Sequence, residues 1–220
     1  MLKLYEDWQS NILEPFLNNN KDHQYSNVFV PGIPSSFTQP NGKIMIIGQM
    51  TNNYGKYGTE TLEELEEFGR NYLERQVYGK VNDWKYNSSP FWQFFRKLKE
   101  EGFDLIWNNV DKVHKIINGE TIWLSESEEL ALNGPYGSEN KSLLEREIDM
   151  ISPTAIIFIT GPNYAYSMAT SFGLPKSSQF SIRPTKDKSL VNIKDNLGLS
   201  ILTFWTYHPN YLNRTYQSNT

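Results

Sequence analysis

The sequence predicts a doubly wound α/β fold, in which helices alternate with the strands of a parallel sheet. Short apolar runs alternate along the chain with segments whose apolar residues recur every three or four positions, which is the pattern of strands followed by helices. Four runs have the length and composition of buried strands: Lys43–Ile47, Phe103–Trp107, Ala155–Thr160 and Leu199–Trp205. No repeat divides the 220 residues, so we expect one domain over 1–220 with its core at 43–212.

The predicted helices are marked by apolar spacing and by capping residues. Apolar residues at helical spacing over 4–17 indicate an amphipathic helix covering one face of the sheet. Thr61 and Glu64 form a capping-box pattern at the start of a helix that continues to about residue 78. Ser89 followed by Pro90 begins another helix, which ends at Gly102. Two further helices are expected at 143–151 and 163–172.

The remaining segments are expected to be mostly irregular. Residues 111–138 are polar and contain glycine, and within them 121–124 has the composition of a short extra strand. Residues 190–193 are expected to be extended, and the polar tail after residue 212 is expected to fray.

Composition excludes several classes of site. The chain has no cysteine, which rules out disulfides, thiolate nucleophiles and iron–sulfur clusters. Its three histidines lack metal-ligand spacing, so no metal and no cofactor are expected. The N-terminus has no secretory apolar core and no run approaches the ~18 apolar residues of a membrane span, so we expect no membrane association and a cytoplasmic location. A net charge of −4 argues mildly against tight non-specific DNA binding, and the sequence does not predict the oligomeric state.

Small polar clusters follow the four predicted strands. In an open parallel sheet, ligands bind outside the carboxyl ends of the strands, so Gln49, Asn109 and His208 are expected to share one crevice. A late histidine can donate a hydrogen bond to a developing anion, and an asparagine side chain offers a donor and an acceptor. Phe91 or Tyr54 is expected to stack on a flat ligand.

Four segments in this order give the chain a family resemblance over about residues 40–215. They are IMIIGQ at 44–49, NVDK at 109–112, the helix–Pro–strand–Gly unit at 144–161, and YHPN at 207–210. The chain therefore resembles the uracil-DNA glycosylase superfamily, as a divergent member. The resemblance implies a three-layer α/β/α fold around a central four-stranded parallel sheet, and a pocket for a base flipped out of DNA.

The resemblance also implies roles for particular residues. Gln49 would hold the base, Asn109 would read its amide edge, and His208 would stabilise charge on the departing pyrimidine. Phe91 or Tyr54 would stack on the base. The family places a water-positioning Asp or Asn two residues after Gly48, where this chain has Met50; Asn52 or Asn53 would then have to place the water.

Each of these residues also has a structural interpretation. His208 can satisfy the backbone of a strand-end turn, Asn109 can cap a turn, and Phe91 lies on a helical stripe typical of core packing. Lys112 is interpreted as a charge at the surface or at a strand end.

Three functions stay open on the sequence. The first is hydrolysis of the base–sugar bond of uracil or a related damaged base in DNA. The second is non-catalytic binding of nucleic acid or of a small planar ligand. The third is hydrolysis of another ester or glycoside. DNA is the expected partner under the first.

Overall fold

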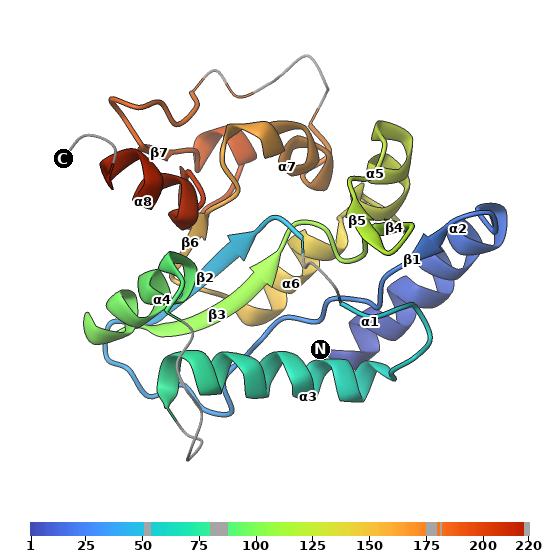
Figure 1. The fold of residues 1–220 in the computed structure, drawn as a ribbon, viewed down its shortest axis with the longest axis horizontal. Helices are drawn as coiled ribbons and strands as arrows, with labels where there is room; N and C mark the ends of the chain where they lie inside the picture. The colour runs from blue at the N-terminus through green and yellow to red at the C-terminus, as the bar shows by residue number, and fades with distance from the viewer. Residues whose placement is uncertain (51–53, 80–87, 175–179, 181, 218–220) are drawn as a thin grey trace.

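The computed structural model describes residues 1–50, 54–79, 88–174, 180 and 182–217, with side chains to Arg214. Its main sheet has five strands (Figure 1). In spatial order they are β3 (Asp104–Asn109), β2 (Lys43–Gly48), β6 (Ala155–Phe158), β8 (Leu202–Thr206) and β7 (Leu190–Asn192). The first four are parallel, and β7 pairs antiparallel with β8.

The α/β prediction is confirmed, and each of the four apolar runs contains a parallel strand. The described sheet nevertheless has five strands where the sequence led us to expect four. The extra strand is β7, in which only Val191 is buried, opposite Trp205 of β8. Three residues are too few to carry a recognisable period of two, and the sequence indicated only an extended segment here.

A second sheet of three short strands lies apart from the first. Its strands are β1 (Gln24–Tyr25), β4 (Lys115–Ile117) and β5 (Glu120–Ile122), all antiparallel. Only the last was expected, and at slightly different bounds. Two of its strands, β4 and β5, lie within residues 111–138, which were expected to be mostly irregular.

Eight α-helices are described. They are α1 (Leu2–Trp8), α2 (Glu14–Asn19), α3 (Leu62–Leu73), α4 (Pro90–Glu100), α5 (Glu126–Asn133), α6 (Leu143–Ile151), α7 (Ala165–Ser171) and α8 (Pro209–Gln217). π-Helical turns at Gln9–Leu13 and Glu74–Tyr78 follow α1 and α3 without a break, and short 3₁₀ turns occupy Pro162–Tyr164 and Asp195–Leu197.

Local capping signals predicted some helix starts and missed others. The capping box of Thr61 with Glu64 is present at the start of α3. The same pattern at Ser125 and Glu128 begins α5, which the sequence interpretation missed inside 111–138. Residues 213–217 of the tail expected to fray belong instead to α8, and 218–220 lie outside the described residues.

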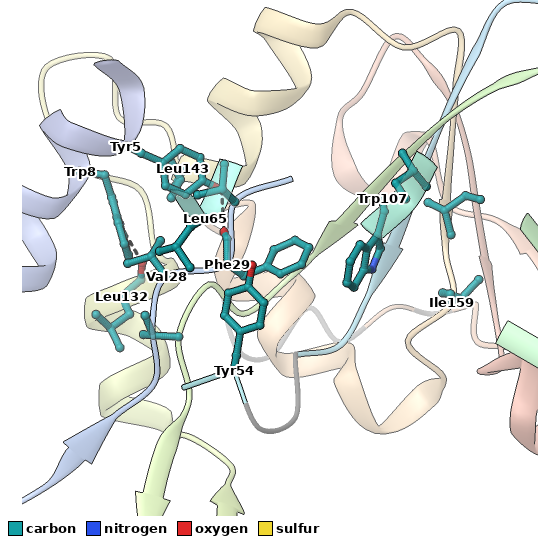
Figure 2. Close-up of a cluster of buried hydrophobic side chains, with 14 of the residues drawn as sticks. Tyr5, Trp8, Val28, Phe29, Tyr54, Leu65, Trp107, Leu132, Leu143 and Ile159 are labelled. Atoms are coloured by element: carbon teal, nitrogen blue, oxygen red, sulfur yellow. Dashed lines mark hydrogen bonds between the residues drawn. The ribbon is translucent and has the colours of Figure 1, made fainter. Parts of the chain in front are cut away.

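Alternate side chains of the central strands belong to two hydrophobic clusters. Ile44, Ile46 and Trp107 belong to the first cluster together with residues of α1, α3 and α4. Figure 2 shows part of this cluster, with Tyr5 and Trp8 of α1, Leu65 of α3 and Trp107 of β3. Met45 and Ile47 pack with α6 and α7 in the second. Alternation of this kind follows from the period of two in a strand that is buried on both faces.

None of the helices in the described part of the chain combines the length and apolar character needed to cross a membrane.

Candidate functional site

A cavity of about 460 Å³ opens at the carboxyl ends of β2 and β3. Residues from the strand ends, from α3 and α4 and from the start of α8 form its wall. They are Gly48, Gln49, Met50, Tyr54, Phe68, Tyr72, Ser89, Phe91, Trp92, Trp107, Asn109, His208 and Asn210. The site therefore lies where the rule for open parallel sheets predicts a ligand.

Five residues singled out in the sequence line this one cavity: Gln49, Tyr54, Phe91, Asn109 and His208. The parallel order of the strands brings Gln49, Asn109 and His208 to a single edge of the sheet. Phe91 reaches the same cavity from α4, and Tyr54 from the segment between β2 and α3. Asn52 and Asn53 lie outside the described residues.

Asn109 is the last residue of β3 and lies against the end of β2. Its side chain is buried, with 3 % of the residue exposed. A Cβ built on Gly48 would come within 2.6 Å of the Asn109 Oδ1 atom, so the carboxamide lies directly over the glycine. Its backbone N–H donates to the Asn108 Oδ1 atom at 2.8 Å.

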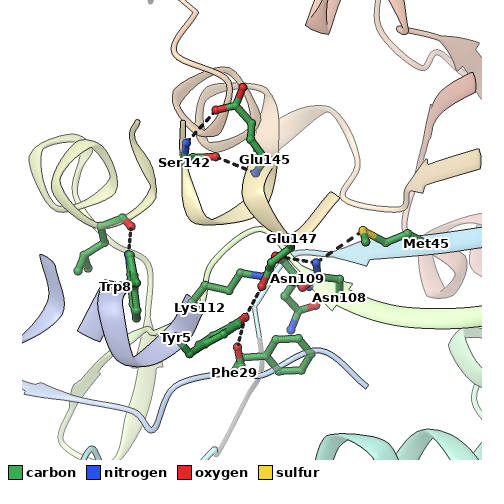
Figure 3. A network of polar contacts seen from close by, with 11 residues as sticks. Tyr5, Trp8, Phe29, Met45, Asn108, Asn109, Lys112, Ser142, Glu145 and Glu147 are labelled. Carbon is green, nitrogen blue, oxygen red and sulfur yellow. Dashed lines mark hydrogen bonds and ion pairs between the residues drawn. The ribbon is translucent and has the colours of Figure 1, made fainter. Parts of the chain in front are cut away.

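A buried polar network supports the backbone of Asn109 (Figure 3). The Lys112 Nζ atom donates to Asn109 O at 2.9 Å, to Asn108 Oδ1 at 2.5 Å and to Glu147 Oε2 at 2.8 Å. Glu147 also accepts from the Asn108 amide and from the Tyr5 hydroxyl, which joins α6, β3 and α1. Lys112 is thus a buried cation near the end of β3, as one of its two interpretations had it. Its interpretation as a surface charge was wrong, because its long side chain reaches inward to Glu147, 35 residues away along the chain.

Two opposing effects act on the pKa of Lys112 in this network. Burial lowers the pKa of Lys112, and the Glu147 carboxylate opposes that shift. A buried ion pair of this kind fixes geometry more surely than it adds stability, because both charges lose their hydration.

His208 is held in one orientation beside the cavity. Its Nδ1 atom accepts a hydrogen bond from the Asn210 backbone N–H at 3.2 Å, so the neutral ring carries its proton on Nε2. The ring stacks on Phe91, with centroids 5.5 Å apart and planes 20° apart. Burial, assisted by the Arg214 guanidinium, lowers the pKa of His208, so the neutral donor form prevails at pH 7.

Gln49 connects the ends of two strands. Its side-chain Nε2 atom donates to the Thr160 backbone carbonyl oxygen at 2.6 Å, beyond the end of β6. The backbone carbonyl of Gln49 accepts from the Asp111 backbone N–H at 3.0 Å. The side-chain amide N–H that reaches Thr160 is therefore already used in holding the site together. The amide oxygen of Gln49 and its second N–H are not used by this bond.

Aromatic side chains form much of the wall. Phe91 packs against His208 on one side and lies 5.0 Å from the Phe95 ring, so it has a structural role in addition to lining the cavity. The sequence interpretation did not assign Tyr72 and Trp107 to the site, although their rings contact one another there. Helical periodicity placed Tyr72 in the core, and no local pattern showed that it borders an opening.

Three buried polar atoms of lining residues have no hydrogen-bond partner in the described structure. They are the Tyr54 hydroxyl, the Trp107 Nε1 atom and the Asn210 Oδ1 atom. Buried polar groups are normally hydrogen-bonded, so these three atoms can pair with polar groups that enter the cavity.

Apart from His208 and the phenols of Tyr54 and Tyr72, no titratable acid or base stands among the described residues of the lining. Met50 is present in it, at the position where the resemblance calls for an acid or an asparagine. The nearby Asp111 is buried elsewhere: its carboxylate accepts from Asn133 and from the Tyr164 hydroxyl at 2.8 and 2.7 Å. Within the described ranges, no three metal-ligating side chains cluster together. The arrangement therefore suits an uncharged planar ligand with hydrogen-bonding edges.

Comparisons of this chain with protein-family models, with curated proteins and with solved structures found no match.

Proposed function

We propose that this protein is a divergent uracil-DNA-glycosylase-like α/β/α domain, which receives an extruded uracil or a related damaged base of DNA and hydrolyses its bond to the sugar. One observation carries the proposal: Gln49, Asn109 and His208 line a single uncharged cavity at the carboxyl ends of parallel strands. The two hydrophobic clusters on alternate strand side chains support the layered fold.

His208 supplies the chemical step. Breaking the base–sugar bond leaves negative charge on a pyrimidine oxygen, and the His208 Nε2–H is the donor available for it, since Nδ1 is occupied by Asn210. A preorganised donor of this type contributes about 10²–10³-fold to a rate. The neutral imidazole retains its proton at pH 7 and needs no proton transfer to act.

Asn109, Gln49 and the aromatic residues of the lining recognise the base. The Asn109 carboxamide combines a donor with an acceptor, which is the pair that the neighbouring O4 and N3–H of uracil require. Tyr54 is better suited than Phe91 to stack on the base, because one face of Phe91 already covers His208.

Met50 favours a second candidate function, binding of a base without cleavage. Methionine cannot orient the attacking water, and a positioned acid–base group contributes typically about 10²–10⁴-fold. If nothing replaces that group, the cavity still binds a planar base, and turnover is slow or absent.

A single-turnover excision assay on single- and double-stranded DNA containing one uracil tests the proposal. We expect cleavage by the unmodified protein and a loss of about 10²-fold or more for His208→Ala. His23→Ala serves as the matched control, because His23 is exposed and is not among the residues that line the cavity.

Binding of the same DNA with a non-hydrolysable 2′-fluorinated deoxyuridine separates the two candidates. Preference for the modified uracil over thymine, without any cleavage of ordinary uracil, supports binding alone. Neither cleavage nor preference would refute both candidates.

A further inference from the structure

A second cavity of about 390 Å³ adjoins the first. It is lined by Asn27, Tyr54, Gly55, Glu60, Glu64, Leu65 and Phe68. Tyr54 and Phe68 belong to the lining of both cavities and form the wall between them. The other five lining residues do not contact the proposed base pocket, so the second cavity has chemistry of its own.

Two buried polar atoms of this lining have no partner among the described residues. Asn27 is 2 % exposed and its Oδ1 atom accepts no hydrogen bond; Tyr54 is 9 % exposed and its hydroxyl makes none. A buried polar group left without a partner is energetically costly. Both would be satisfied by a ligand that brings N–H donors into the cavity.

Two carboxylates stand at the same cavity. Glu60 accepts from the Asn27 amide and the Thr59 hydroxyl. Glu64 accepts from the Thr61 N–H at 2.8 Å as part of the α3 capping box. Within the described chain, neither glutamate pairs with a lysine or an arginine, so their negative charge faces the cavity without a cation.

The backbone of Gly55 closes one side of the cavity. Gly55 has φ +70°, and a Cβ there would come within 2.6 Å of the Asn27 Nδ2 atom and 3.4 Å of the Glu60 carboxylate. Only glycine adopts this conformation freely and allows the approach. A side chain at position 55 would therefore displace Asn27 or Glu60.

We propose that this cavity is a second binding site, which takes a guanidinium or ammonium group carried on a short apolar stem. The cation donates to Asn27 Oδ1 and to Glu60, and its charge is balanced by the two carboxylates. A planar guanidinium suits this set best, because it presents five N–H donors in a fixed fork. Phe68, 48 % exposed, offers an aromatic face for a cation, and Leu65 contacts the stem.

The second cavity differs from the first in charge. Its two carboxylates repel the phosphates of a DNA strand, so it does not suit the backbone of a nucleic acid. The proposed cation site does not depend on base excision, and its test needs no DNA.

Titration of the full chain with butylguanidinium, followed by ¹H–¹⁵N NMR at the Gly55 and Glu60 amides, tests this site. Butylurea is the matched neutral probe, with the same shape and no charge. We expect saturable shifts with butylguanidinium and a dissociation constant on the order of 1 mM, and much weaker binding of butylurea.

The variant Glu60→Gln should weaken butylguanidinium binding by about fivefold or more, because it removes one charge and keeps the shape. Glu63→Gln makes the same charge change on α3 outside the lining and should leave affinity within about twofold. Tyr54→Phe, which loses the unpaired hydroxyl, should also weaken binding. Equal binding of the two probes, equal effects of Glu60→Gln and Glu63→Gln, or no saturable shift would overturn the proposal.

Discussion

Adding one methyl group at Gly48 should disable the proposed base pocket while leaving the fold intact. Gly48 does not have a positive φ, so its backbone accepts an alanine without strain. The new Cβ would lie 2.6 Å from Asn109 Oδ1, while the next closest atom, Asn108 O, is 3.7 Å away. The conflict is therefore confined to the one side chain that we propose reads the base.

The size of the effect follows from that geometry. To restore an ordinary contact, the Asn109 carboxamide has to move away from β2 by roughly 1 Å, which breaks its alignment with a bound base. Loss of hydrogen bonds to an oriented amide costs about 1–3 kcal/mol, or roughly 5- to 150-fold in affinity for the uracil analogue. Overpacking of the strand ends should lower the free energy of unfolding by about 1–3 kcal/mol.

A double-mutant cycle measures this coupling. Urea unfolding and analogue binding are measured for Gly48→Ala, Asn109→Ala and the double variant. Because Asn109→Ala removes the atom that clashes, adding Gly48→Ala to it should cost little stability, so the two effects should be far from additive. Additive losses of stability, or full binding by Gly48→Ala, would refute the placement of the Asn109 side chain.

Two further predictions concern buried charges. Burial lowers the pKa of His114 from 6.5 to about 4, so between these pH values the unfolded chain binds a proton that the folded chain excludes. The free energy of unfolding should therefore fall by up to about 3 kcal/mol as the pH drops from 6.5 toward 4. His114→Asn should remove that part of the pH dependence of urea unfolding. An unchanged pH slope in the variant would contradict this. Lys112→Met leaves the Glu147 carboxylate buried without its cation and should lower the free energy of unfolding by about 3–5 kcal/mol in the same measurement. Adding Glu147→Leu to this variant should recover most of that loss. A loss under about 1 kcal/mol for Lys112→Met alone would show that the pair is not buried as described.

Much of the fold and part of the site followed from local patterns in the sequence. Apolar runs such as the one at β2 predict buried parallel strands wherever they lie in the chain. Because parallel strands end at one edge, their order alone placed Gln49, Asn109 and His208 together. The Thr61 capping box is likewise a contact between residues three apart, which the sequence shows directly.

Only the tertiary structure decided which side chains surround the two cavities and how those side chains are held. Lys112 forms its ion pair with a residue 35 positions away, Gln49 bonds to Thr160 across 111 positions, and the Asn27 amide reaches Glu60 across 33. Side-chain direction and long-range pairing depend on how whole elements pack, and no periodicity in the chain encodes them. The sequence thus determined at which edge of the sheet the polar strand-end residues meet, and packing determined that the cavity there is uncharged, aromatic and adjacent to an acidic one.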